Sequence, residues 1–95
     1  MIMFFANKIR QLREDQELLQ RQLAAALEID TPMYSKIERG DRPAKREQVL
    51  TIAKIFSIDE KELLTLWLAD KIWGVIENEN LISERALDIV RDNLK

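Results

Sequence analysis

Apolar residues recur every three to four positions along most of the chain, which is the period of an amphipathic α-helix. In the first such run, Ile2, Phe5, Ile9 and Leu12 share one face, and the pattern fades across the polar residues 14–17. Later runs predict helices at about 20–27, 30–39, 45–56, 60–77 and 83–94. The sequence therefore predicts an all-α fold.

The residues at the ends of these runs are ones that start and stop helices. Asp30 offers a side-chain oxygen to cap the third helix, and Pro32 needs no amide partner in its first turn. Gly40 is placed to adopt the left-handed conformation that ends this helix. Asp59 and Ser83 are expected to cap the fifth and sixth helices.

Composition narrows the class of protein. The chain has 95 residues, no cysteine and no histidine, which excludes disulfides, zinc–thiolate sites and the commonest acid–base side chain. Nor do the two glycines form a loop that could hold a nucleotide. We therefore expect no enzyme, no catalytic residue, no cofactor and no metal. The apolar stretch 63–69 is far too short to span a membrane, which favours a cytoplasmic protein.

The charge is unevenly distributed. The net charge is −2, but residues 1–46 carry nine basic and seven acidic residues, and residues 47–95 carry six and ten. Five of the basic residues lie within 36–46. Because screening limits charge effects to about 8 Å at physiological salt, a polyanion at this segment would sense mainly the local cations. The distribution is compatible with DNA binding, although the net charge is acidic.

Two short helices joined by a tight turn are the most informative feature. The connection at residues 28–29 is too short for antiparallel neighbours, so the helices at 20–27 and 30–39 should cross steeply, as in a helix-turn-helix. Ala24 would permit close contact, and Ile29 and Ile37 would anchor the second helix. Its outer face could then enter a DNA major groove. The candidates on that face are Thr31, Pro32, Met33, Ser35 and Lys36.

Residues 9–64 resemble the Cro/phage-repressor (Xre-type) helix-turn-helix family. The resemblance rests above all on the string Tyr-Ser-Lys-Ile-Glu-Arg-Gly at 34–40 and its distance from Gln-x-x-Leu-Ala at 20–24. Leu-Arg at 12–13, Ile-Asp at 29–30, Val-Leu-x-Ile-Ala at 49–53 and Ile-Asp-x-x-x-Leu at 58–63 complete it. It implies a five-helix repressor-like domain followed by a C-terminal helical extension.

The resemblance also implies roles for individual residues. The five candidates of the third helix would face base edges, and Gln20 would touch the DNA backbone while bracing Thr31. Glu38 would be structural, and Gly40 would end the helix. The residues expected to contact the DNA backbone are Gln20, Arg21, Arg39, Arg42, Lys45 and Arg46.

Several positions leave alternatives open. Leu19 stands where many relatives have a capping Ser or Thr, and Pro43 lies one residue earlier than the usual proline. Lys36 has the alternative of being a solvated surface lysine, and Met33 that of a core residue. Tyr34 is expected to be at least partly buried, with its hydroxyl near the surface.

The fifth helix is apolar on more than one face, which favours a homodimer interface. The sixth helix adds Ile82, Ala86, Val90 and Leu94 at steps of four residues. Alternatively, the sixth helix folds back over the fifth within one chain. The residues expected at the interface, with both tryptophans as anchors, are Leu64, Trp67, Leu68, Ile72, Trp73, Val75 and Ile76.

Together these features predict a DNA-binding domain at 1–64 and a helical extension at 65–95 that dimerises it. The expected function is that of a homodimeric transcriptional repressor or autoregulator that reads a palindromic operator in double-stranded DNA. A restriction–modification controller and a prophage-type repressor both fit this class. The alternative is an antitoxin that binds a toxin protein and autoregulates its operon.

Overall fold

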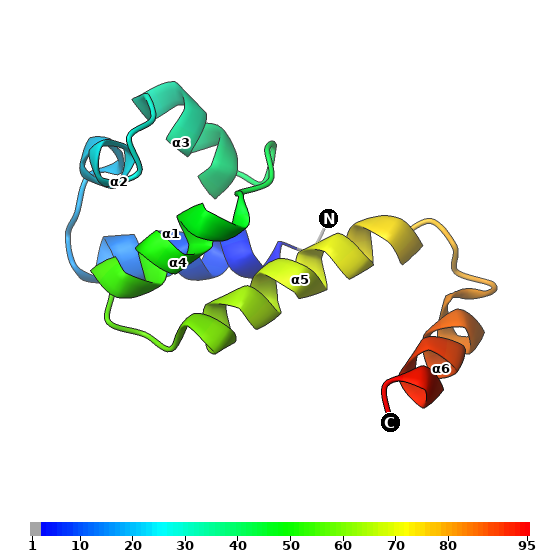
Figure 1. Cartoon of the computed structure of the whole chain (residues 1–95). Coiled ribbons are helices and arrows are strands. Elements are labelled where there is room, and N and C mark those ends of the chain that lie inside the picture. The colour runs from blue at the N-terminus through cyan, green and yellow to red at the C-terminus, as the bar shows by residue number, and fades with distance from the viewer. Residues whose placement is uncertain (1–2) are drawn as a thin grey trace.

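The computed structural model describes residues 3–95 and contains six helices over that range (Figure 1). No described residue lies in a strand, so the predicted all-α fold is confirmed. In the described part of the chain, no helix is long and apolar enough to cross a membrane. The helices are α1 (Phe4–Asp15), α2 (Gln20–Ala26), α3 (Thr31–Glu38), α4 (Arg46–Ile55), α5 (Glu60–Ile76) and α6 (Ser83–Asn93).

The helix ends agree with the sequence with one exception. Asp59 caps α5 by accepting a hydrogen bond from the Lys61 amide at 3.0 Å. The expected cap at Ser83 is wrong, because Ser83 is the first residue of α6, and Ile82, which precedes the helix, makes no side-chain cap. The expected contribution of Ile2 to the first helix lies outside the described residues.

Helices α1 to α5 surround one hydrophobic core. Its most deeply buried side chains come from all five helices, so each helix contributes its apolar face to the same interior. Burial of a large aliphatic side chain contributes about 1.5–3 kcal/mol, which makes this core the main source of stability. The largest fully buried side chains are Tyr34, Ile9, Leu23, Ile52, Leu63 and Val49.

The start of α1 is capped by a residue of α5. The Asp70 carboxylate accepts hydrogen bonds from the amides of Phe4 at 2.6 Å and Phe5 at 3.0 Å. These amides have no partner within α1, and a carboxylate also interacts favourably with the positive end of the helix dipole. The second half of α5 is thereby tied to the N-terminal helix.

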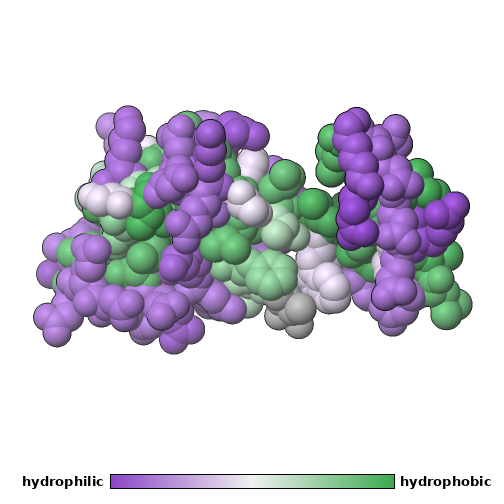
Figure 2. All heavy atoms as spheres, turned by 90° about the horizontal axis from the view of Figure 1, so that it is seen from below, coloured by the Kyte–Doolittle hydropathy of each residue, from purple (hydrophilic) through white to green (hydrophobic). Residues whose placement is uncertain are grey.

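Beyond this point, the end of α5 and all of α6 extend away from the core (Figure 1). No residue of α6 is buried. Figure 2 shows hydrophobic residues at the surface between the domain and α6, and again along the edge of α6. The structure therefore differs from the alternative in which the sixth helix folds back and packs over the fifth.

Candidate nucleic-acid interface

The turn between α2 and α3 is tight, as the sequence predicted. The Ile29 amide donates to the Ala24 carbonyl oxygen at 3.0 Å, and Ala24 is buried where the two helices meet. Glu28 has a φ of 59°, in the left-handed region that favours glycine. The chain can therefore reverse direction within a few residues and set α3 at a steep angle to α2.

Asp30 begins α3 in the expected way. Its carboxylate accepts a hydrogen bond from the Met33 amide at 2.7 Å, and Pro32 occupies the first turn. Such a cap typically contributes about 1 kcal/mol to stability. It also fixes the position of the helix N-terminus, the end that approaches base edges in helix-turn-helix complexes.

The two faces of α3 are sharply different. Tyr34, Ile37 and Glu38 are buried against the rest of the domain. The five residues predicted to face bases all lie on the remaining face, where Thr31, Pro32 and Lys36 are exposed and Met33 and Ser35 are partly exposed. The structure therefore brings this predicted set together on one solvent-facing surface.

Glu38 holds the end of α3 to α1 and α2. Its carboxylate accepts hydrogen bonds from Arg13 Nε at 2.9 Å, Arg13 Nη2 at 2.7 Å and Gln20 Nε2 at 3.2 Å. Burial alone would raise the pKa of Glu38, but the hydrogen bonds and charge of Arg13, helped by Gln20, lower it below the usual value. The role of Glu38 is thus to lock α3 against the domain.

Gln20 has a different partner from the one expected. The resemblance implied that it would brace Thr31, but its side-chain amide instead donates to Glu38, at the opposite end of α3.

The start of α2 lacks a capping Ser or Thr. The Gln22 side chain supplies part of a cap by accepting from the Leu19 amide at 2.7 Å.

Tyr34 is completely buried, and its hydroxyl is also enclosed rather than near the surface as expected. Among the described residues, none makes a hydrogen bond to this hydroxyl oxygen. Burial, with the nearby Glu38 carboxylate, raises the pKa of Tyr34 far above its usual value. The ring therefore acts as a core residue beneath the exposed face of α3.

Gly40 ends α3 as predicted. Its φ is +79°, and a Cβ atom at this position would overlap the sulfur of Met3. The left-handed backbone therefore favours glycine at this position, and a larger residue would also require the Met3 side chain to move.

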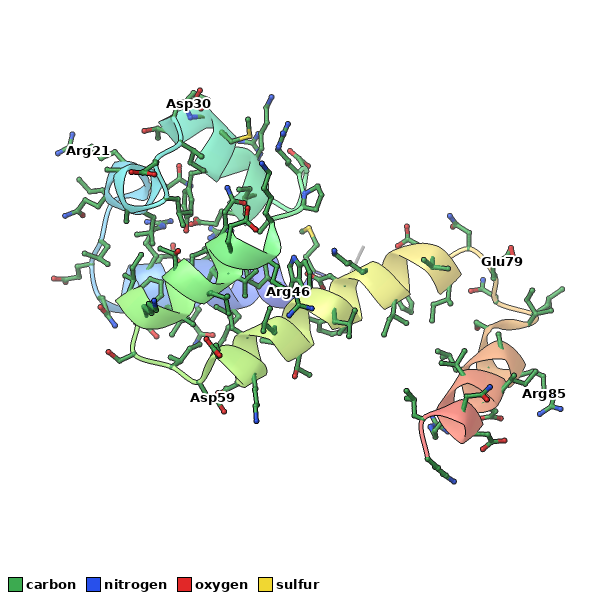
Figure 3. The ribbon with its side chains drawn as sticks, viewed as in Figure 1. Arg21, Asp30, Arg46, Asp59, Glu79 and Arg85 are labelled. Atoms are coloured by element: carbon green, nitrogen blue, oxygen red, sulfur yellow. The ribbon has the colours of Figure 1, made fainter. Side chains whose placement is uncertain are left out.

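A basic loop and the start of α4 lie beside α3. Arg39, Arg42, Lys45 and Arg46 are all exposed, although Arg39 is engaged by Asp41 at 3.0 Å and by the Ser35 hydroxyl. Arg21 is exposed on α2, and Figure 3 shows it extending from that helix while Arg46 extends from the start of α4. Exposed cations thus occur on α2, which precedes α3 in the chain, and on the loop and helix that follow it.

Trp67 and Lys71 extend this basic surface onto α5. Lys71 Nζ lies 3.7 Å from the centroid of the Trp67 ring, and Arg46 Cζ lies 5.3 Å from it. Arg42, Lys45, Arg46 and Lys71 line one groove next to α3, and no acidic residue of the described chain lines it. Sequence reasoning missed Lys71. Its spacing of four residues from Trp67 on a helix was the available signal.

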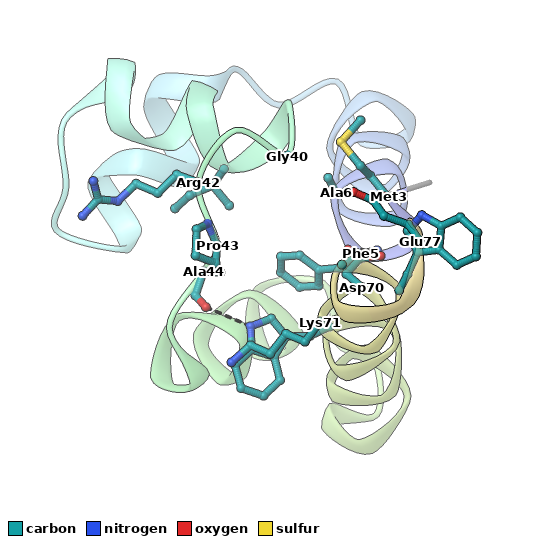
Figure 4. A pocket seen from close by; sticks show the side chains of 14 residues that line it. Met3, Phe5, Ala6, Gly40, Arg42, Pro43, Ala44, Asp70, Lys71 and Glu77 are labelled. Carbon is teal, nitrogen blue, oxygen red and sulfur yellow. Dashed lines mark hydrogen bonds between the residues drawn. The ribbon is translucent and has the colours of Figure 1, made fainter. Parts of the chain in front are cut away.

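Trp67 was expected at an interface between copies, but the structure buries it in its own chain. Its indole nitrogen donates to the Ala44 carbonyl oxygen at 2.8 Å, which ties α5 to the loop after α3 (Figure 4). The other residues of the predicted interface are distributed as follows: Leu64 packs against the core, Trp73 and Ile76 are partly exposed, and Leu68, Ile72 and Val75 are exposed.

A small cavity of about 210 Å³ separates the loop after α3 from α5 and the start of α1 (Figure 4). Phe5, Pro43 and Trp73 are among its lining residues. Elsewhere in the described chain, no group of three or more carboxylate side chains is gathered in a way that could hold a metal ion. The groove beside α3 is thus the polar and basic candidate site of the domain.

The comparisons with known proteins agree with this surface. A family model described as "Helix-turn-helix" matches residues 9–63, more than half of the chain. No curated protein and no solved structure matches the chain.

Proposed function

The chain belongs to the Cro/Xre-type helix-turn-helix family, a family of DNA-binding transcriptional regulators and not of enzymes, and we propose that it is a sequence-specific repressor or autoregulator acting in the cytoplasm. In this proposal α3 enters the major groove of double-stranded DNA. Residues 1–64 form the five-helix DNA-binding domain, and residues 65–95 form the extension that pairs two copies. Helix α5 belongs to both parts.

The exposed face of α3 is the observation that carries this proposal. Its opposite face is buried and locked by Glu38, so the helix cannot turn to present other residues. A major groove about 12 Å wide accommodates a helix with side chains of this size. Lys36 can donate to guanine O6 and N7, while Thr31 can reach a base or a phosphate at the helix start.

The surrounding cations would neutralise phosphates rather than read bases. Arg21, Arg42, Lys45, Arg46 and Lys71 are long, exposed and outside α3, which is the placement of residues that position a protein on the DNA backbone. Arg39 would first have to leave Asp41, a cost that is small because this ion pair is exposed. The Gln20 side-chain amide already donates to Glu38. A contact between Gln20 and the DNA backbone would therefore come from the exposed N-terminus of α2.

A homodimer would give the operator its symmetry. Two copies related by a two-fold axis would place their α3 helices in half-sites about 34 Å apart, one turn of DNA. The exposed apolar residues Leu68, Ile72 and Val75 support an interface at the end of α5. Regulators of restriction–modification genes and prophage-type repressors are the two kinds of regulator that this description fits.

An antitoxin is the second candidate function. The exposed apolar side chains of α6 favour it, because they could receive a toxin protein while α3 autoregulates the operon. A chain that forms a stable, soluble dimer when purified alone would count against this candidate, since the apolar surface would then already have its partner.

Selection of bound duplexes from a random DNA pool tests the proposed function. We expect a palindrome whose half-sites are centred about one helical turn apart. Recovery of no consensus sequence, or of a single site without two-fold symmetry, would contradict sequence-specific reading by a pair of α3 helices.

A further inference from the structure

The exposed apolar side chains of this protein are concentrated in its C-terminal third. Ten large apolar residues are exposed in the described chain, and eight of them lie between residues 68 and 94. Val75 is 78% exposed, Leu94 81% and Leu81 99%. Soluble monomers rarely leave so many large apolar side chains of one segment in water, so this segment calls for a covering surface.

The segment contains two apolar rows with the same spacing. Leu68, Ile72 and Val75 form the α5 row. Ile82, which directly precedes α6, forms the α6 row together with Ala86 and Ile89. Each follows the pattern i, i+4, i+7, so each occupies one helix face and extends for about 10 Å at a rise of 1.5 Å per residue. Val90 widens the α6 row on the same side. The two rows therefore match in length and in chemical character.

Within one chain, neither row covers the other. Every residue of both rows is exposed, and α6 lies beyond the end of α5 (Figure 1). The turn between the helices is held by backbone hydrogen bonds, from the Glu79 amide to Ile76 at 2.8 Å and from the Ser83 amide to Glu79 at 2.8 Å. This ordered turn fixes the start of α6, and both rows stay exposed beside it.

We propose that two copies of the chain exchange their α6 helices, so that the α6 row of each copy packs on the α5 row of the other. This inference rests on the proposed homodimer and specifies how it is built. It makes α6 an arm that crosses to the partner rather than a cover for its own domain.

Two-fold symmetry and the area that a stable interface needs both favour a second copy of the chain as the partner that covers these rows. A two-fold axis turns one contact between an α5 row and an α6 row into two identical contacts, which leaves neither row uncovered. A stable interface buries about 800 Å² on each partner. Three side chains of an α5 row paired with their own copies are too few for that area, whereas exchange adds the whole apolar face of α6.

Disulfide trapping tests the exchange directly, because the chain contains no cysteine. Ile72 and Ala86 are the middle residues of their rows, so they face each other whether the paired helices run parallel or antiparallel. We would mix a tagged Ile72→Cys chain with an untagged Ala86→Cys chain, allow the subunits to exchange, oxidise the mixture and separate it without reducing agent. The expected product is a disulfide between one tagged and one untagged chain.

Matched controls identify the contact. Arg91 lies on the opposite face of α6 from Ala86, so Ile72→Cys mixed with Arg91→Cys should give at least tenfold less of the mixed disulfide. A double variant, Ile72→Cys with Ala86→Cys, should give covalent dimers. If it gives only monomers with an internal disulfide, α6 folds back on its own chain and the exchange is wrong.

Two further results would overturn the proposal. Trapping of Ile72→Cys alone, without reaction with Ala86→Cys, would mean that the α5 rows pair with each other. A wild-type chain that sediments as a monomer at micromolar concentration would leave the apolar rows to a different protein, such as a toxin.

Failure of this inference is distinguishable from failure of the proposed function. A monomer that still binds a single half-site would overturn the exchange and leave DNA recognition intact. Trapped dimers that bind no duplex would establish the exchange and contradict DNA recognition. Circular dichroism of each variant confirms that the cysteines leave the helical fold unchanged.

Discussion

At the scale of single residues, neighbours in α3 have opposite tasks. Lys36 is exposed in the middle of the helix, whereas Glu38, two positions later, is buried and ion-paired with Arg13 at 2.7 Å. Burial separates a residue that is free to meet DNA from one that holds the helix in place. Changes at the two positions should therefore alter different properties.

Replacing Lys36 by Ala should alter the choice among DNA sequences. A bidentate contact to guanine discriminates between bases by about 1–3 kcal/mol. K36A should therefore lose about that much binding free energy on the best operator and little on unrelated DNA. R42A, which removes a backbone contact, should weaken binding to all duplexes about equally. Titration of both variants with the selected operator and a scrambled duplex checks this, and equal losses on both duplexes from both variants would refute the division of roles.

Replacing Glu38 by Gln should destabilise the fold. Removing one partner of a buried ion pair typically costs about 3–5 kcal/mol, because the other charge is left without compensation. Urea unfolding at pH 7 measures the loss. E14Q is the control, because it removes an exposed carboxylate and should change stability by less than about 1 kcal/mol.

The same ion pair predicts a pH dependence. The folded-state pKa of Glu38 is lowered, so its stabilisation is complete above the unfolded-state pKa of about 4.3 and is lost as the pH falls through the folded-state value. The difference in unfolding free energy between wild type and E38Q should therefore shrink below about pH 4. A difference that stays constant from pH 7 to pH 3 would contradict this role.

At the scale of helices, periodicity and caps predicted most of what the structure contains. Asp30, Gly40 and Asp59 mark helix ends through local chemistry, which a sequence records directly. Ser83 did not act as a cap, because α6 begins one residue earlier than a cap at that position requires. The outward face of α3 could also be predicted, since short amphipathic helices reveal which side is polar.

Contacts between distant helices could not be predicted in the same way. Trp67 is one of many apolar residues on α5, and a helix that is apolar on several faces does not reveal which residues meet its own chain. The bonds from Gln20 to Glu38 and from Asp70 to the start of α1 join residues 18 or more positions apart. Their pairing depends on how helices pack, which local patterns do not specify.

Lys71 on α5 should contact a DNA phosphate beside the exposed face of α3. A protein that loses one phosphate contact loses about 0.9 from the slope of log affinity against log salt concentration. K71Q should show this reduction with unchanged sequence preference. The control is K54Q, in the last turn of α4, which should retain the wild-type slope. If wild type, K71Q and K54Q all have the same slope, Lys71 does not contact the DNA.

At the scale of the whole molecule, α5 connects DNA recognition with assembly. Its first half contributes Leu63 and Trp67 to the core, and its second half carries an exposed apolar row. Any pairing through that row therefore fixes the positions of the two α3 helices relative to each other. Spacing between half-sites is then a property of the α5 and α6 contact rather than of α3.

A charge on the α5 row should separate assembly from recognition. Val75 is exposed, so V75D should fold normally but burial of its carboxylate should oppose dimerisation. Analytical ultracentrifugation should show a monomer, and affinity for the full palindrome should fall at least tenfold more than affinity for one half-site. Q11D introduces the same charge on exposed α1 and should remain a dimer.

Chemical probing of the major groove tests the central claim most directly. Dimethyl sulfate methylates guanine N7, the atom that lies where α3 is proposed to enter. On the selected operator, wild-type protein should protect guanines in two clusters about one helical turn apart, and K36A should lose protection at one guanine in each cluster. A bound complex that leaves every guanine N7 reactive, or no complex with any duplex at low salt, would contradict the account.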